Sequence, residues 1–167
     1  EICSILPKPL KSDLGEGLLI LGVNSTIYYD SPDLKDIATM LARDIYRLTG
    51  NQIPISGKKD KNSDIQLELS KKLINDEYKI EINKYISLSA SNIEAAQAAV
   101  VSLSQLCINH LNKIAFPKIS VSDRPALAYR GLLMDVARQW HSISDLKQII
   151  EVCRWYKINY LQLHLTD

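Results

Sequence analysis

The sequence lacks the features that would place it in several large functional classes. Its 167 residues contain only three cysteines, Cys3, Cys107 and Cys153, an odd number without the spacing of a metal site. Cys107 and Cys153 lie in apolar helical patterns, so we expect buried thiols. No glycine-rich phosphate loop, nucleophile elbow or cluster of metal ligands occurs in the sequence. We therefore predict neither a metal nor a cofactor.

An excess of charge and a long apolar run are also missing. The 20 Lys and Arg residues nearly balance the 19 Asp and Glu residues, and the net charge of +1 gives no electrostatic reason to expect nucleic acid. No apolar stretch is long enough to span a bilayer. Because neither an initiator Met nor a signal-peptide pattern is present, we expect the chain to begin after processing or inside a longer protein. What is present, 46% apolar and 23% charged residues, is typical of a soluble globular protein.

Alternating apolar and polar residues predict strands in the first part of the chain. The segments Ile65–Leu69, Tyr78–Ile82 and Ile86–Ala90 alternate as half-buried strands do. The short link at residues 83–85 predicts a hairpin between the last two. We therefore expect a sheet of the antiparallel type.

Two helices are expected beside these strands. The first begins at Ser31-Pro32-Asp33, with Ser as cap and Pro at the first helical position, and ends at Gly50. The second begins at a capping box of Ser91 and Glu94, and its many alanines predict close packing on a sheet. Residues 1–124 thus form one predicted α+β domain.

The pattern changes after Asp123-Arg124-Pro125. Residues 132–135 form a predicted strand, Ser142 and Asp145 cap a predicted helix, and residues 160–166 form a second strand. This order requires parallel strands and a right-handed crossover. On the second strand Gln162, His164 and Thr166 share one face, which fits either a barrel interior or a solvated face.

Charged residues follow both of these strands. Arg138 lies shortly after the first strand and Asp167 directly after the second. The carboxyl ends of parallel strands are where ligands bind in α/β proteins, so the pair is a candidate site. An Arg can donate two hydrogen bonds to sugar hydroxyls or to a carboxylate, and an Asp can orient a His or a substrate group. A structural Arg–Asp pair that caps the strand ends is the alternative.

Four nearby residues have open or structural interpretations. His164 is either a ligand or acid–base group or, more commonly for such a position, a hydrogen-bonded interior His. Asp135 is a second candidate for catalysis. Arg130 precedes its strand, at the end opposite to the usual site, which favours a structural role. Trp140, in the loop after Arg138, is available to stack on a sugar ring, and its role stays open.

Two long motifs in the last part of the chain resemble a known family. Residues 129–138, Tyr-Arg-Gly-Leu-Leu-Met-Asp-Val-Ala-Arg, and residues 156–167, Tyr-Lys-Ile-Asn-Tyr-Leu-Gln-Leu-His-Leu-Thr-Asp, resemble the start of the catalytic barrel in family 20 glycoside hydrolases, the β-N-acetylhexosaminidases. The upstream half is similar to the N-terminal accessory domain of that family at residues 5–9, 77–82, 86–90 and 102–106. The chain departs from the family pattern at Ala95, Ala98, Ala99, Leu127 and Gln139-Trp140.

The resemblance implies a fold and an activity. Residues 1–124 correspond to the accessory domain, and residues 125–167 to the first strand–helix–strand of a (β/α)8 TIM barrel, truncated after it. The implied enzyme is an exo-β-N-acetylhexosaminidase that removes terminal N-acetylhexosamine from glycans by a retaining, substrate-assisted mechanism. Arg138 matches the residue that binds hydroxyls of the terminal sugar, and Asp167 matches one that supports the catalytic network. The catalytic Asp-Glu pair lies further downstream in the family, so we expect this piece alone to be inactive.

The resemblance also implies partners and a setting. The expected partner is a glycan with terminal N-acetylhexosamine, in a periplasmic or secreted setting, with no nucleic acid. Exposed barrel strand edges predict that these residues either pack onto the accessory domain or self-associate with a second copy. A stand-alone interaction or carbohydrate-binding module without chemistry is the competing interpretation. A reading frame that continues to a later Asp-Glu pair would favour the enzyme.

Overall fold

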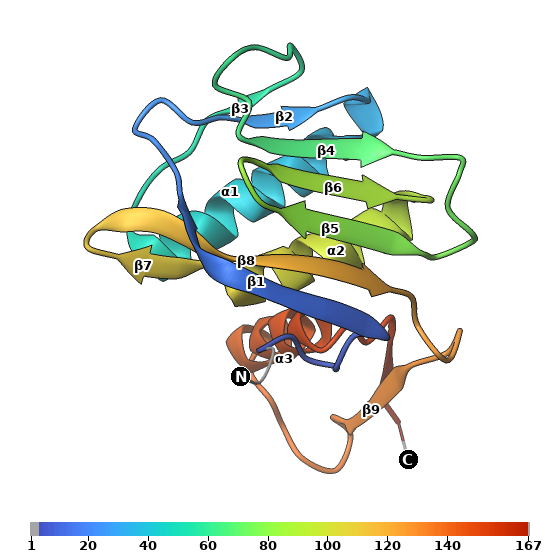
Figure 1. Cartoon of the computed structure of the whole chain (residues 1–167). Coiled ribbons are helices and arrows are strands. Elements are labelled where there is room, and N and C mark those ends of the chain that lie inside the picture. The colour runs from blue at the N-terminus through green and yellow to red at the C-terminus, as the bar shows by residue number, and fades with distance from the viewer. Residues whose placement is uncertain (1–3, 167) are drawn as a thin grey trace. The chain divides into compact units, whose positions relative to one another are not determined.

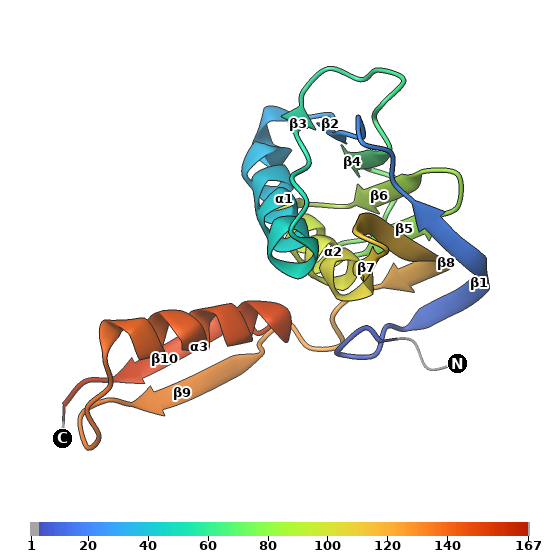
Figure 2. The same ribbon diagram turned by 90° about the vertical axis from the view of Figure 1, so that its left-hand side faces the viewer.

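The computed structural model describes residues 4–166, and the chain divides between Arg124 and Pro125 into two compact units. Cys3 and Asp167 lie outside the described residues. The first unit is a sheet of eight strands with helices α1 and α2 along one face (Figure 1). The second is a strand–helix–strand unit (Figure 2). The part of the chain that the structure describes holds no helix long and apolar enough to cross a membrane.

The described part of the first unit contains two α-helices and eight strands. The helices are α1, Lys35–Thr49, preceded by a 3-10 turn at Pro32–Leu34, and α2, Ile93–Leu106. The strands are β1 Lys11–Ile20, β2 Ile27–Tyr29, β3 Ile55–Ser56, β4 Ile65–Leu69, β5 Tyr78–Ile82, β6 Ile86–Ala90, β7 Ile108–His110 and β8 Lys113–Asp123.

The sheet is mixed, which corrects the expectation of an antiparallel type. Its order is β1-β8-β5-β6-β4-β2-β3, with β7 pairing to β8. The β5–β6 hairpin is antiparallel, as predicted, but β2 pairs in parallel with both β3 and β4, and β4 pairs in parallel with β6. Helix α1 carries the chain from β2 to β3, and such a crossover makes neighbouring strands parallel. Residue alternation reports only which face is buried, so it does not reveal strand direction.

The sequence patterns missed the long strand β8 and the first part of β1; the apolar run at residues 18–21 predicted a strand, and it coincides with the end of β1. Strands β1 and β8 pair antiparallel, with a shift of register between Leu14 and Leu18. Gly15 and Gly17 lie in this bulge, and Gly17 has a φ of 81°. A bulge bends a strand and breaks its alternation. The two glycines therefore resembled a turn although they lie inside a strand.

Helix α2 begins one residue later than predicted. Asn92 is its N-cap, and Asn92 Oδ1 accepts a hydrogen bond of 2.8 Å from the backbone N–H of Ala95. The hydroxyl of Ser91 is buried and makes no hydrogen bond within the described chain. The predicted capping box of Ser91 and Glu94 is therefore wrong. The prediction of close packing is confirmed, because Ala96 and Ala99 are fully buried.

A buried polar network holds the end of β8 in the core. The hydroxyl of Tyr78 lies 2.7 Å from Ser102 Oγ and donates a hydrogen bond of 2.6 Å to Asp123 Oδ2. Asp123 Oδ1 accepts a hydrogen bond of 3.1 Å from the backbone N–H of Leu10. Because buried polar groups are costly when unpaired, this network fixes the last residue of β8 just before the boundary between the units.

The expectation of buried thiols is confirmed for the two cysteines that the structure describes. Cys107 and Cys153 are both buried and unpaired. Burial raises the pKa of the Cys107 thiol to about 12. A thiol with so high a pKa is not a nucleophile at neutral pH, so Cys107 is a packing residue.

The capping correction predicts a difference between two neighbouring variants. Asn92→Ala removes the cap and is expected to lower the free energy of unfolding by about 1 kcal/mol. Ser91→Ala removes a hydroxyl that has no hydrogen-bond partner in the described chain and is expected to change the free energy of unfolding by less than ~0.5 kcal/mol. Urea unfolding of both variants, followed by circular dichroism, measures the difference. Equal losses, or a larger loss for Ser91→Ala, would contradict the assignment of the cap.

Candidate functional site

The second unit consists of two parallel strands joined by one helix. Strand β9 is Gly131–Asp135, α3 is Ile143–Trp155 and β10 is Tyr160–His164. The register runs from Gly131 opposite Tyr160 to Asp135 opposite His164. The predicted caps are confirmed: Ser142 and Asp145 form a capping box at the start of α3. Helix α3 lies along one face of the strand pair (Figure 2).

Three polar side chains meet at the carboxyl ends of these strands. Asp135 and His164 end β9 and β10 and are partners in the register, so their side chains share one face of the pair. His164 Nδ1 lies 3.6 Å from Asp135 Oδ2. Arg138 Nε, from the turn after β9, lies 3.8 Å from the same oxygen. We call Asp135, Arg138 and His164 the strand-end cluster.

The carboxylate of Asp135 also organises the turn that carries Arg138. Asp135 Oδ1 accepts hydrogen bonds from the backbone N–H groups of Arg138, at 3.0 Å, and Ala137, at 3.1 Å. The hydrogen bond from the backbone N–H of Arg138 is the main cause that lowers the pKa of Asp135. The hydrogen bond from Ala137 and the neighbouring His164 lower this pKa further. The Asp135 carboxylate is therefore ionised at neutral pH. It accepts the hydrogen bonds of the turn and also lies beside the side chains of Arg138 and His164.

The cluster has the chemistry of a polar-ligand site. The side chain of Arg138 is 72% exposed and that of His164 is 40% exposed, so ligand atoms can approach both. The guanidinium of Arg138 presents N–H donors, which suit hydroxyl or carboxylate oxygens. Within residues 4–166, no group of three or more His, Cys, Asp or Glu side chains is arranged to hold a metal ion.

The structure places Arg138 at the carboxyl ends of the strands, as the sequence predicted. Its described neighbour there is not the residue that the sequence suggested. Asp167, its predicted companion, lies outside the described residues, so its role stays a prediction. The described partner of Arg138 is Asp135, three residues earlier. His164 lies beside Asp135 on this two-stranded unit and is 40% exposed, and its role stays a prediction. Asp135 was already a candidate from the sequence, but its pairing with Arg138 depends on the path of the turn after β9.

Arg130 has the structural role that its position predicted. Its Nε donates to the carbonyl of Lys157 at 2.8 Å, and its guanidinium also donates to the carbonyl of Leu127. Its backbone N–H donates to Asn159 Oδ1 at 2.9 Å. These contacts tie the start of β9 to the turn before β10, at the end of the strands opposite to the cluster. Trp140, 82% exposed, follows the cluster in the loop toward α3.

Comparison with known families divides the chain at the same place as the structure. The sequence model of "Glycosyl hydrolase family 20, domain 2" matches residues 2–124. That of "Glycosyl hydrolase family 20, catalytic domain" matches residues 127–167, which contain the strand-end cluster.

Curated relatives carry corresponding names. A β-N-acetylhexosaminidase of Cellulomonas fimi is 31% identical over 98% of this chain and 34% of that protein. A β-hexosaminidase of Vibrio furnissii is 30% identical over 98% of this chain and 26% of that protein. The chain thus spans about a third or less of the length of these relatives.

Solved structures share the fold. A family 20 exo-β-N-acetylglucosaminidase from Vibrio harveyi, in complex with N-acetylglucosamine, superposes with a TM-score of 0.90 at 23% identity, over 99% of this chain and 26% of that one. The β-N-acetylhexosaminidase from Streptomyces coelicolor A3(2) gives a TM-score of 0.87 at 21% identity, over 99% of this chain and 35% of that one.

The hydrogen bonds around Asp135 predict its titration. We expect the folded-state pKa of Asp135 to lie below the ordinary value of 3.8. The turn then contributes stability that is fully present above pH 3.8 and is lost as the pH falls through the lower folded-state value. In His164→Ala the pKa should rise but stay below 3.8, because the backbone N–H of Arg138 is the larger cause. Carboxyl ¹³C NMR measures both titrations; a midpoint at or above 3.8 in the unmodified chain would refute this geometry.

Proposed function

Because this chain belongs to glycosyl hydrolase family 20, we propose that it forms the accessory domain and the first strand–helix–strand of the catalytic (β/α)8 barrel of an exo-β-N-acetylhexosaminidase. The observation that supports this most is the strand-end cluster. It lies in the stretch that matches the catalytic domain, at the carboxyl ends of two parallel strands. Enzymes with this barrel place their active sites at that edge.

The proposed substrate is a glycan that ends in N-acetylhexosamine. Arg138 donates hydrogen bonds to hydroxyls of the terminal sugar, and Asp135 holds the turn from which it does so. His164, beside the same carboxylate, completes the polar wall of that subsite. Asp167, three residues beyond His164, supports the catalytic network.

The proposed chemistry is retaining and substrate-assisted. In such a mechanism the acetamido oxygen of the substrate attacks its own anomeric carbon, so no protein carboxylate acts as the nucleophile. One carboxylate orients the acetamido group and a second donates a proton to the leaving oxygen. The resemblance places that Asp-Glu pair downstream of residue 167, so Arg138 binds in this scheme but does not carry the chemistry. A periplasmic or secreted setting is part of the proposal and rests on the resemblance alone.

The exposed face of the second unit supports a proposal of self-association. The face away from α3 presents Leu133 and Tyr160, 58% and 53% exposed. Within the described residues, β9 and β10 pair only with each other, so each leaves one edge unpaired. Unpaired edges beside apolar side chains recruit further strands. We therefore propose that residues 1–167 alone pair with a second copy through β9 and β10.

Activity is expected only from the longer protein. Residues 1–167 should not hydrolyse a chromogenic aryl N-acetyl-β-glucosaminide above the buffer rate, because the proposed general acid is missing. The protein encoded by the complete reading frame should release the aryl group readily. Turnover by residues 1–167 would disprove the assignment of the chemistry to downstream residues. An inactive complete protein would instead favour the non-catalytic interaction or carbohydrate-binding module.

Association is tested by light scattering of residues 1–167 across a range of concentrations. The expected result is a dimer that dissociates on dilution and is weakened by Leu133→Ser, which removes apolar contact from the exposed face. Leu111→Ser is the matched control, because Leu111 is 83% exposed in the turn between β7 and β8. A strict monomer at every concentration, or equal weakening by both variants, would rule out pairing through this face.

A further inference from the structure

The sheet of the first unit has an open outer face. Helices α1 and α2 lie on the other face (Figure 1). On β5 and β6 the side chains that point away from the helices are polar and half-buried or exposed: Lys79, Glu81, Ser87 and Ser89. The strands that carry them are central, with β8 on one side and β4 on the other. Their backbone groups are therefore paired, and any ligand of this face must be recognised by side chains.

The register aligns five polar side chains in a row across this face. Tyr28 on β2 lies opposite Gln66 on β4, which lies opposite Ser87 on β6. Ser87 lies opposite Glu81 on β5, which lies opposite Ser120 on β8. Opposite residues share a face, and neighbouring strands are about 4.8 Å apart. We call Tyr28, Gln66, Ser87, Glu81 and Ser120 the sheet-face row.

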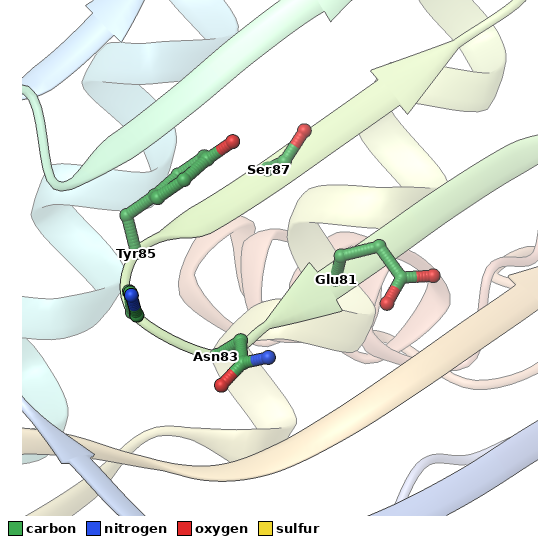
Figure 3. A pocket seen from close by; sticks show the side chains of 5 residues that line it. Glu81, Asn83, Tyr85 and Ser87 are labelled. Atoms are coloured by element: carbon green, nitrogen blue, oxygen red, sulfur yellow. The ribbon is translucent and has the colours of Figure 1, made fainter.

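A depression lies beside the middle of the row. It has a volume of about 270 Å³ and is lined by Glu81, Asn83, Lys84, Tyr85 and Ser87. Figure 3 shows Tyr85 and Asn83 at the turn between β5 and β6, with Glu81 and Ser87 on the two strands that the turn joins. The volume is near the lower limit of ~300 Å³ for ligand pockets. It suits one small ring rather than a large ligand.

The polar groups of the depression are mostly uncommitted. Within the described residues, the side chains of Asn83, Tyr85 and Ser87 make no hydrogen bond. Glu81 Oε1 accepts a hydrogen bond of 2.6 Å from the hydroxyl of Ser120. Tyr85 is 48% exposed, so an aromatic ring is available beside these groups.

We propose that the sheet-face row and the depression bind a neutral oligosaccharide. Tyr85 packs against one sugar ring, and Asn83, Ser87 and Glu81 form hydrogen bonds with the hydroxyl and amide groups of that sugar. Sugar rings combine an apolar face with a rim of donors and acceptors, which matches one aromatic ring beside amide, hydroxyl and carboxylate groups. The opposite charges of Lys84 and Glu81 favour an uncharged ligand.

Other ligand classes fit this face less well. Nucleic acid requires a basic groove that tracks the phosphates, whereas Lys59 and Lys79 beside the row lie 3.5 Å from Glu68 and 3.6 Å from Glu77. A peptide that adds a strand requires an exposed sheet edge, whereas β5 and β6 are paired on both sides. The row extends on both sides of the depression, so further sugar units of a chain would meet Gln66 on one side or Ser120 on the other; beyond Gln66, Lys59 Nζ lies 5.5 Å from the centre of the Tyr28 ring. The site consists of residues of the first unit alone and needs no catalysis.

The test is an NMR titration of ¹⁵N-labelled residues 1–167 with the β-1,4-linked trisaccharide of N-acetylglucosamine, a probe whose choice rests on the proposed function. The expected result is saturable shifts of the amides of residues 81–87. Tyr85→Ala should raise the Kd at these amides roughly tenfold, as expected for the loss of one aromatic contact. Tyr46→Ala is the matched control, because Tyr46 is 52% exposed on α1, and it should leave the Kd unchanged.

A second variant and a second group of amides separate the two sites. Ser87→Ala should also weaken binding at residues 81–87, whereas Arg138→Ala should not. No saturable shift at residues 81–87, shifts confined to residues 135–138 and 164, or an unchanged Kd in both Tyr85→Ala and Ser87→Ala would overturn the proposal. In those cases hydrolysis by the longer protein would leave the proposed function intact. Binding at residues 81–87 together with an inactive longer protein would support this site and contradict the proposed function.

Discussion

The carboxylate of Asp135 is the contact on which the candidate site depends. It ends β9, accepts two backbone hydrogen bonds from the turn that follows, and lies within 4 Å of both Arg138 Nε and His164 Nδ1. The parallel register brings His164 to the same level, and the turn brings Arg138 back toward the strand end. Without this acceptor, the turn would lose two hydrogen bonds and Arg138 the carboxylate 3.8 Å from its Nε. The arrangement of the strand-end cluster thus follows from the Asp135 side chain and the parallel pairing of β9 with β10.

The two units differ in how they are stabilised. The first buries a continuous apolar core between its sheet and helices α1 and α2, and the Tyr78–Asp123 network secures the end of β8. The second has 43 residues by its bounds, Pro125–Asp167, and Cys153 is its one buried apolar side chain among the residues described. A unit of about 40 residues rarely builds a sufficient core by itself. The exposed Leu133 and Tyr160 are therefore expected to need a partner surface, either further barrel strands or a second copy.

Sequence patterns predicted the elements with strong periodicity. They did not predict features that depend on how one strand pairs with another, such as a bulge or the relative direction of two strands. Helix α1, helix α3 with its Ser142–Asp145 box, and the β5–β6 hairpin were predictable because their signals are local. The first part of strand β1 was hidden by the glycines of its bulge, and the parallel pairing of β4 with β6 has no signature in either strand alone. At the site, the edge that carries Arg138 followed from strand–helix–strand order. The pairing of Arg138 with Asp135 did not, because it depends on the path of a turn.

The central claim is that Arg138, held by Asp135, binds the terminal sugar. The most direct measurement is kcat/KM of the complete protein on an aryl N-acetyl-β-glucosaminide, for Arg138→Ala and for Arg47→Ala, an exposed arginine in the last turn of α1. Loss of charge-assisted hydrogen bonds worth ~1.5–3 kcal/mol predicts a fall of roughly 10- to 100-fold for Arg138→Ala and no change for Arg47→Ala. Unchanged kcat/KM in Arg138→Ala, or equal losses in both variants, would contradict the account.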